Sequence, residues 1–301
     1  MLPFKSKYHL CDLFDIPIYI DISLIFLLLF FATGGGSLFD GLGCALLLLV
    51  SITAHEFGHA LTARSFGYRT LDITLSLLGG CASLIALPKK ASQEFLTALA
   101  GPAVSFALMG LGVLGVSALG TGGDVVSYFY HDIMGHFPKE LPVVDGDVLF
   151  YVEGMSERLV YSCSRSYFDT MQMLSYLAEM NLMLGIFNLL PGFPMDGGRI
   201  FRSAMRPFLS RVDATYVAMV VGRVVAVFIG LRGFWNVTHG ANWGFVTMMI
   251  AWMIWKEGYR EYLLSTVESI WDVNNFRVHV SPPPYGGSGD ESDVDRGWPR
   301  A

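Results

Sequence analysis

The stretch Ser51-Ile52-Thr53-Ala54-His55-Glu56-Phe57-Gly58-His59-Ala60 contains the pattern His-Glu-x-x-His within an apolar run over residues 41–66. Residues four apart lie on one face of a helix, so His55 and His59 can bind one metal ion together. Glu56 lies beside them and can reach a water molecule at that metal. A zinc ion with an open position lowers the pKa of bound water to about 7 and polarises a carbonyl group. The stretch therefore predicts a site for amide hydrolysis.

The apolar surroundings of the pattern strengthen this interpretation. A lone histidine in an apolar helix is usually an ordinary core residue. Each ionisable group inside a lipid-spanning helix, however, costs a few kcal/mol and tends to mark function. Two histidines and a glutamate in one such run therefore favour a metal site over simple packing.

The composition predicts a membrane protein whose partner is the lipid bilayer. The chain is 53% hydrophobic and 15% charged, whereas soluble domains carry about 25% charged residues. The net charge is -6 and no basic tract is present, so we expect no nucleic-acid partner. The four cysteines form no Cys-x-x-Cys pair, which argues against a thiolate zinc site. The N-terminus lacks the pattern of a removable signal peptide.

The apolar runs predict an all-α polytopic membrane protein with about six transmembrane helices. The expected spans are residues 16–32, 41–66, 92–119, 171–190, 214–231 and 243–255, since about 20 residues cross a bilayer. Alternating apolar residues on both sides of Gly79-Gly80 predict a small membrane-associated β-hairpin or sheet over residues 70–88. An irregular loop is the alternative.

These elements define one intramembrane domain over residues 1–270, with an outer loop over about 120–170. The loop is rich in acidic residues, and a lid, a substrate filter and a solvated connector all fit it. Residues 280–301 are rich in Ser, Pro, Gly and Asp and predict a disordered cytoplasmic tail.

A second motif lies where the fourth expected span ends, in Asn188-Leu189-Leu190-Pro191-Gly192-Phe193-Pro194-Met195-Asp196-Gly197. Broken backbone at membrane depth is tolerated only where it faces protein or a water-filled cavity. Asp196 is therefore well placed as a third metal ligand, because two histidines and a carboxylate form a catalytic zinc set. The alternative is an aspartate that ends a helix at the membrane surface.

The distribution of basic residues predicts the orientation. With six spans, one side of the membrane carries the termini and the loops 67–92 and 191–212. The basic residues on that side are Lys5, Lys7, Arg69, Lys89, Lys90, Arg199, Arg202, Arg206 and Arg211. The positive-inside rule places both termini and the metal-proximal side in the cytoplasm, in a cell (inner) membrane.

The two motifs together resemble the site-2 protease family of intramembrane zinc metalloproteases, in its compact six-helix form. The resemblance covers residues 12–230 and includes Ile16-Pro17-Ile18 and Ala100-Gly101-Pro102. It implies one zinc ion per chain with the ligands His55, His59 and Asp196. It further implies that Glu56 is the catalytic base and that Asn188 stabilises the oxyanion.

Two departures from the family pattern concern positions that are not ligands. Ser105 stands where the family often has asparagine, and Asp21 stands where it often has histidine. We therefore expect local substrate contacts to differ while metal binding is kept.

The expected function is hydrolysis of peptide bonds within or near transmembrane segments of membrane protein substrates, in regulated intramembrane proteolysis. The substrate backbone must be extended to expose its carbonyl, and the 70–88 hairpin could bind it by β-addition. A metal-binding membrane transporter would explain the spans, but not the glutamate directly after His55. A catalytically inactive relative would be expected to lack a ligand or the base, and all four positions are intact.

Overall fold

The computed structural model describes residues 7–24, 38–76, 79–84, 88, 90–119, 143–144, 147–153, 158–240 and 243–270. Its helices in this part of the chain are α2 (Leu38–Ser65), α3 (Ala91–Leu119), α5 (Arg165–Asn188), α6 (Asp196–Met205), α7 (Arg211–Thr238) and α8 (Trp243–Ile270). Its strands are β1 (Lys7–Leu13), β2 (Ile16–Asp21), β3 (Thr70–Ser76), β4 (Gly79–Leu84), β5 (Val143–Val144), β6 (Asp147–Glu153) and β7 (Arg158–Ser164).

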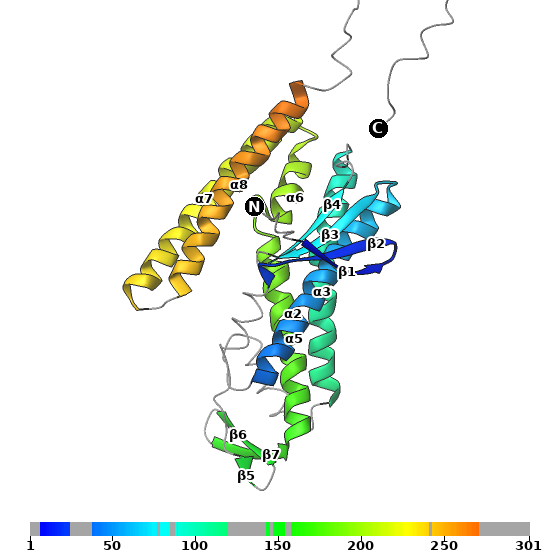
Figure 1. Ribbon diagram of the computed structural model, residues 1–301. Coiled ribbons are helices and arrows are strands. Elements are labelled where there is room, and N and C mark those ends of the chain that lie inside the picture. Colours follow the sequence, from blue (N-terminus) through cyan, green and yellow to red (C-terminus); the bar gives the residue numbers. More distant parts are fainter. Residues whose placement is uncertain are drawn as a thin grey trace, which may run out of the picture.

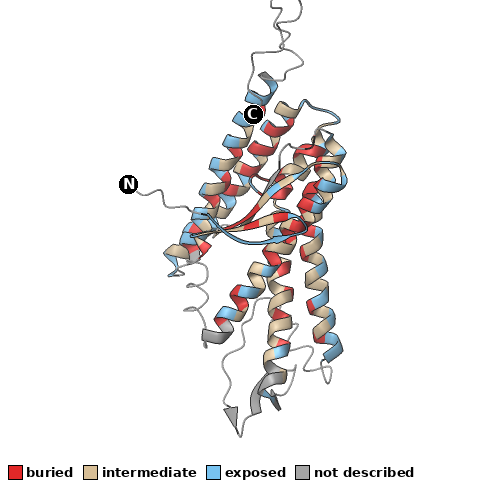
Figure 2. Ribbon diagram, turned by 45° about the vertical axis from the view of Figure 1, so that its right-hand side comes forward, coloured by how far each residue is buried: buried red, intermediate tan, exposed pale blue. Residues whose placement is uncertain are grey.

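The helices form two groups that α6 joins. Helices α2, α3 and α5 run side by side, and α7 and α8 form a hairpin next to them (Figure 1). The short helix α6 packs against α3 on one side and α7 on the other. Buried residues concentrate on the facing sides of the helices (Figure 2). The two sequence motifs thus lie on elements that meet where the groups join.

Three described helices are long and apolar enough to cross a membrane: Gly41–Ser65, Ala91–Leu119 and Arg211–Thr238. Much of their outer surface, and that of α8, is apolar. Exposed side chains there include Leu111, Leu114, Phe228, Leu231, Phe234 and Trp252. A surface of this kind suits lipid rather than water. The expected spans 171–190 and 243–255 are helical and lie in α5 and α8. Neither helix is among the three described helices that are long and apolar enough to cross a membrane. The count of six spans therefore stays a prediction.

The predicted hairpin is confirmed and is part of a larger sheet. Strand β3 pairs antiparallel with β4, so that Ser76 faces Gly79. Strand β2 pairs parallel with β3 and antiparallel with β1, which gives the order β1-β2-β3-β4.

One expectation is wrong: residues 16–21 are a strand and not the start of the first transmembrane helix. Within Ile16-Pro17-Ile18-Tyr19-Ile20-Asp21, Ile16 and Ile18 are buried on one face of the sheet. This alternation has the period of two that is typical of a β-strand. It indicates a strand even though the segment is apolar enough to suggest a membrane-spanning helix. Residues 25–32 of the expected span lie outside the described residues.

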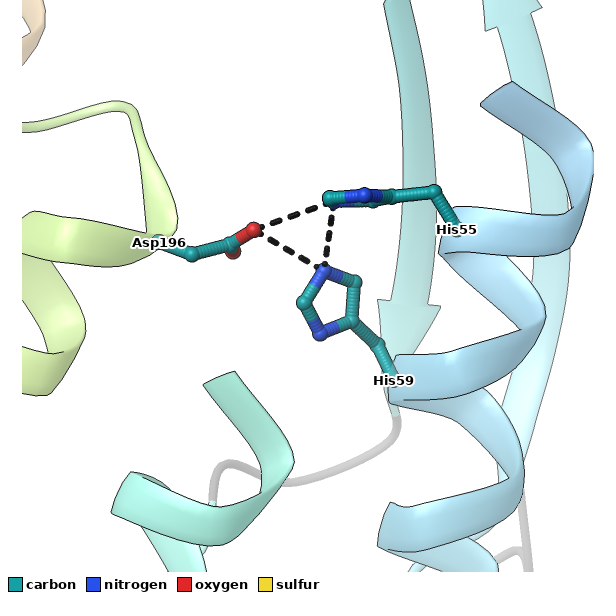
Figure 3. A group of neighbouring side chains, drawn as sticks. All are labelled: His55, His59 and Asp196. Atoms are coloured by element: carbon teal, nitrogen blue, oxygen red, sulfur yellow. Dashed lines mark hydrogen bonds and ion pairs between the residues drawn. The ribbon is translucent and has the colours of Figure 1, made fainter. Parts of the chain in front are cut away.

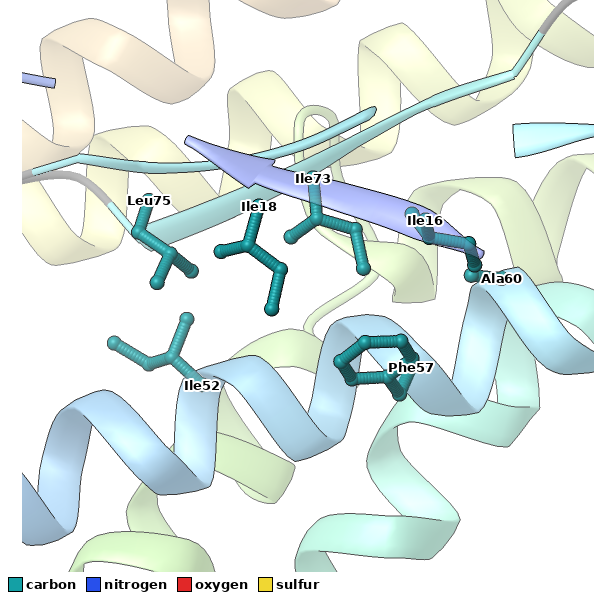
Figure 4. Close-up of a cluster of buried hydrophobic side chains, with 7 residues drawn as sticks. All are labelled: Ile16, Ile18, Ile52, Phe57, Ala60, Ile73 and Leu75. Atoms are coloured by element: carbon teal, nitrogen blue, oxygen red, sulfur yellow. The ribbon is translucent and has the colours of Figure 1, made fainter. Parts of the chain in front are cut away.

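The sheet packs on the helix that carries the histidines. Ile16 and Ile18 of β2 and Ile73 and Leu75 of β3 point at α2 (Figure 4). They meet the side chains of Ile52, Phe57 and Ala60. Phe57 lies between the two histidines in sequence, but its side chain packs against the sheet, whereas the imidazoles of His55 and His59 contact α3.

The segment 120–170 contains structure that the sequence pattern did not indicate. Strands β5, β6 and β7 form a three-stranded antiparallel sheet in the order β5-β6-β7. Helix α5 begins at Arg165, earlier than expected, because the side chain of Ser164 caps it by accepting a hydrogen bond from the Tyr167 amide. The expected tail at 280–301 lies outside the described residues.

Candidate metal centre

Three side chains from two distant motifs converge on one point (Figure 3). Nε2 of His55 and Nε2 of His59 lie 3.1 Å apart. Oδ2 of Asp196 lies 3.1 Å from the first nitrogen and 3.0 Å from the second. All three residues are buried. The structure therefore brings together the three predicted ligands, and they could hold a metal ion.

The hydrogen bond on the far side of the His59 ring indicates which kind of ion the site could bind. Nδ1 of His59 lies 2.7 Å from the carbonyl oxygen of Thr97. A carbonyl only accepts, so Nδ1 donates, and in the neutral imidazole Nε2 then presents a lone pair. That lone pair and the Asp196 carboxylate oxygen repel each other unless a cation or a proton lies between them. The donor set of two nitrogens and one oxygen suits zinc.

The spacing of the three atoms agrees with this interpretation. Two ligands at about 2.0–2.1 Å from a tetrahedral zinc ion lie roughly 3.3 Å from each other. The separations of 3.0 and 3.1 Å between the three atoms are close to that value. Only small side-chain movements would be needed to bind the ion.

Helix α3 orients both imidazole rings, a role that the sequence analysis missed. Nδ1 of His55 lies 2.9 Å from Oγ of Ser105, which is fully buried. The oxygen of Thr97 contacts the other ring. Thr97, Gly101 and Ser105 are spaced four apart, so they form one stripe on α3. This spacing was visible in the sequence, but nothing local indicated that the stripe faces the histidines.

Glycines allow α2 and α3 to approach this closely. A Cβ atom at Gly101 would collide with the rings of both His55 and His59. A Cβ atom at Gly58 would lie 2.7 Å from the carbonyl oxygen of Ala100, closer than real contacts allow. The Ala-Gly-Pro segment and the Gly of the first motif are thus where the two helix backbones touch.

The predicted base, Glu56, lies on α2 between the cluster and strand β4. A Cβ atom at Gly80 would lie 2.9 Å from both Cδ and Oε1 of Glu56. Gly80 of the hairpin therefore leaves space for this carboxylate. Glu56 is only partly buried, so its carboxylate is more accessible than the three converging side chains.

The break after α5 delivers Asp196 to the histidines. Helix α5 ends at Asn188 and α6 begins at Asp196, with a cis peptide bond between Phe193 and Pro194. Cβ atoms at Gly197 and Gly198 would collide with the backbone of the intervening turn. The turn therefore folds back tightly on the start of α6. Asp196 is the first residue of α6, and a helix N-terminus stabilises the negative charge of its carboxylate.

Asn188 is not part of the converging cluster. Its Nδ2 donates a hydrogen bond of 2.9 Å to the Leu184 carbonyl oxygen within α5. The amide has a second donor hydrogen. The residue lies at the end of the helix from which the turn to Asp196 starts.

The fold and the cluster are those of a membrane protein with a buried His-His-Asp group that could hold a metal ion. The sequence pattern of Peptidase family M50 matches residues 43–230, more than half of the chain. The chain belongs to this peptidase family, which confirms the resemblance to site-2 proteases noted from the motifs.

Individual relatives agree with this assignment. A Synechocystis protein named as a candidate zinc metalloprotease, sll0528, is 31% identical over 83% of this chain and 58% of its own length. The zinc metalloprotease MJ0392 of Methanocaldococcus jannaschii is 26% identical over 79% of this chain and 55% of its own. The chain thus spans little more than half the length of these relatives. The solved structure of the site-2 protease from M. jannaschii matches with a TM-score of 0.53 at 26% identity, over 85% of this chain and 95% of that one.

Proposed function

We propose that this protein is an intramembrane zinc metalloprotease that hydrolyses peptide bonds within or near transmembrane segments of membrane protein substrates. The observation that carries the proposal is the convergence of His55, His59 and Asp196 within 3.1 Å of one another, with Glu56 on the same helix. Family membership and the names of the relatives support the zinc-dependent chemistry.

In this proposal His55, His59 and Asp196 hold one zinc ion per chain. When bound, zinc polarises the scissile carbonyl and lowers the pKa of a bound water molecule. The Thr97 carbonyl oxygen keeps His59 in the tautomer that ligation needs. The contacts of Thr97 and Ser105 with Nδ1 hold both imidazoles in orientation.

Glu56 is the general base and acid. It accepts the proton of the attacking water and later gives it to the leaving amine, which is the usual exchange of roles by one carboxylate. Asn188 stabilises the developing oxyanion through its second amide hydrogen, because its first already binds the Leu184 carbonyl oxygen. Since that hydrogen bond fixes the side chain, little reorganisation is needed during the reaction.

Strand β4 is the proposed docking site for the unfolded substrate segment. It lies at the edge of the four-stranded sheet and pairs with no further strand in the described part of the chain. Its Gly80 lies against Glu56. A substrate strand that pairs with β4 would therefore pass next to the base with its backbone extended.

The membrane arrangement is also part of the proposal. Six spans with both termini in the cytoplasm, in a cell (inner) membrane, put the metal-proximal side toward the cytoplasm. The substrate is a transmembrane protein that reaches the site through the bilayer, and the cleavage belongs to regulated intramembrane proteolysis.

The direct test is cleavage in proteoliposomes loaded with zinc. A panel of single-span peptides with helix-breaking residues at different depths is incubated with the wild type and with Glu56→Gln. We expect cleavage by the wild type of at least one peptide. We expect loss of cleavage by about 10²–10⁴-fold in the variant, with zinc content unchanged. Undiminished cleavage by Glu56→Gln would overturn the role of this residue.

A further inference from the structure

An ion-pair network is buried between three helices beside the metal centre. Arg202 lies in α6 and is 1% exposed. Its Nε and Nη2 donate to Oε1 of Glu94 in α3, at 2.8 and 2.5 Å. Its Nη1 donates to Oε1 of Glu261 in α8, at 2.8 Å. Glu94 is 5% exposed. The sequence analysis counted Arg202 among the membrane-flanking charges, and the structure shows it inside the protein.

Arg202 is charged in these surroundings. Burial alone would lower its pKa, but the carboxylates of Glu94 and Glu261 outweigh this effect and raise the pKa above the usual value. Its guanidinium group also lies 5.0 Å from the centre of the Phe193 ring, in the turn that leads to Asp196. The network therefore contacts both α6 and the turn before it.

Both partners of the central pair are linked to the metal centre through short stretches of backbone. Arg202 follows Asp196 by six residues in one helix, which is about 9 Å along its axis. Glu94 precedes Thr97 by three residues of α3, a little less than one turn, and the carbonyl oxygen of Thr97 accepts a hydrogen bond from Nδ1 of His59. The relative position of α3 and α6 thus decides how far Asp196 lies from the histidines.

We propose that Arg202 and Glu94 are positioning residues for the metal centre: their buried pair locks α6 against α3 and so places Asp196 within ligating distance of His55 and His59. This inference rests on the proposed zinc function. Glu261, whose side chain is partly exposed, extends the lock to α8. Neither residue of the pair touches the reacting atoms.

A purely stabilising role makes a different prediction. Buried ion pairs contribute little net stability, and their replacement by apolar residues of similar size is often neutral or stabilising. Removal of one partner alone leaves an uncompensated buried charge. A double replacement removes both central charges at once. It leaves Arg206, which also pairs with Glu94, and Glu261 without these partners, but both side chains are partly exposed. The double replacement therefore separates positioning from stability.

The experiment uses the full-length protein in detergent with four variants. Arg202→Met/Glu94→Leu removes the pair, and Arg202→Lys keeps the positive charge but loses the planar guanidinium group. Glu261→Gln removes the negative charge that α8 contributes and leaves the pair of Arg202 and Glu94 in place. Arg260→Gln alters an exposed arginine of α8 and is the control. Zinc affinity is measured by chelator competition, and the visible spectrum of the cobalt-substituted protein reports ligand geometry. Thermal unfolding is followed in parallel.

We expect the double variant to unfold near the wild-type temperature but to bind zinc about 10–100-fold more weakly, the usual effect of losing a supporting contact. Its cobalt spectrum should change. Arg202→Lys should recover part of the affinity, Glu261→Gln should lose less than the double variant, and Arg260→Gln should match the wild type.

Wild-type zinc affinity and cobalt spectrum in the folded double variant would overturn the positioning role. Failure of both the double variant and Arg202→Lys to fold would overturn it as well, because the pair would then be structural. A wild type that binds no zinc would instead reject the proposed function.

Discussion

Oγ of Ser105 lies 2.9 Å from Nδ1 of His55, although the two residues are 50 positions apart. Because the Ser105 side chain is fully buried, water cannot replace this contact. We predict that Ser105→Ala lowers zinc affinity by about 10–100-fold, as is typical when the partner of a ligating histidine is lost. Chelator competition measures the effect. Ser117→Ala is the matched control, since Ser117 lies on the same helix and is exposed; an equal loss in both variants would contradict the prediction.

Gly101 provides the clearest steric test. A methyl group there would collide with both imidazole rings. The two buried rings have little freedom to move aside. We predict that Gly101→Ala abolishes stoichiometric zinc binding and destabilises the fold by about 1–3 kcal/mol, the usual cost of overpacking. Gly110→Ala in the same helix has open space around the new Cβ atom and should bind zinc normally. Retention of zinc by Gly101→Ala would mean that the rings do not lie as described.

Asn188 tests the proposed oxyanion stabilisation. We predict that Asn188→Ala lowers kcat by about 10²–10³-fold, as for loss of one oxyanion donor, while zinc affinity stays at the wild-type value. Steady-state cleavage of the best peptide from the panel measures kcat. Gln172→Ala, also on α5, is the control. A loss of zinc together with activity would make Asn188 a structural residue instead.

Gly80 connects the sheet to the base. A valine side chain at this position would have to displace the Glu56 carboxylate. We predict that Gly80→Val lowers cleavage to the level of Glu56→Gln and leaves zinc bound, because the atoms nearest to a side chain at this position belong to Glu56 and not to one of the three ligands. Parallel assays of zinc content and cleavage distinguish this result from general misfolding, in which both would be lost.

Local patterns in the sequence predicted the centre of the site but not its support. The spacing of His55 and His59 guarantees a common helix face, and Asp196 directly follows the Pro/Gly break between two helices. The contacts of Ser105 and Thr97 depend instead on how α3 is rotated against α2. That rotation depends on Gly58, which lies against the Ala100 backbone, and on Gly101, which lies against both imidazole rings, and no local pattern encodes it.

The fold could be predicted where apolar periodicity was unambiguous. The hairpin over β3 and β4 follows from alternation on both sides of Gly79-Gly80. The same alternation in residues 16–21 was hidden by high apolar content, since a strand packed on a helix and a lipid-spanning helix are both apolar. Arg202 could not be placed because its partners, Glu94 and Glu261, lie on distant helices.

The most direct test of the account is the zinc content of the purified wild type and of Asp196→Ala, because it needs no substrate. Asp196 supplies the only carboxylate of the three converging groups. We predict one zinc ion per wild-type chain and a clear loss in the variant. A wild type without zinc, or a variant that keeps its full zinc content, would contradict the assignment of the site.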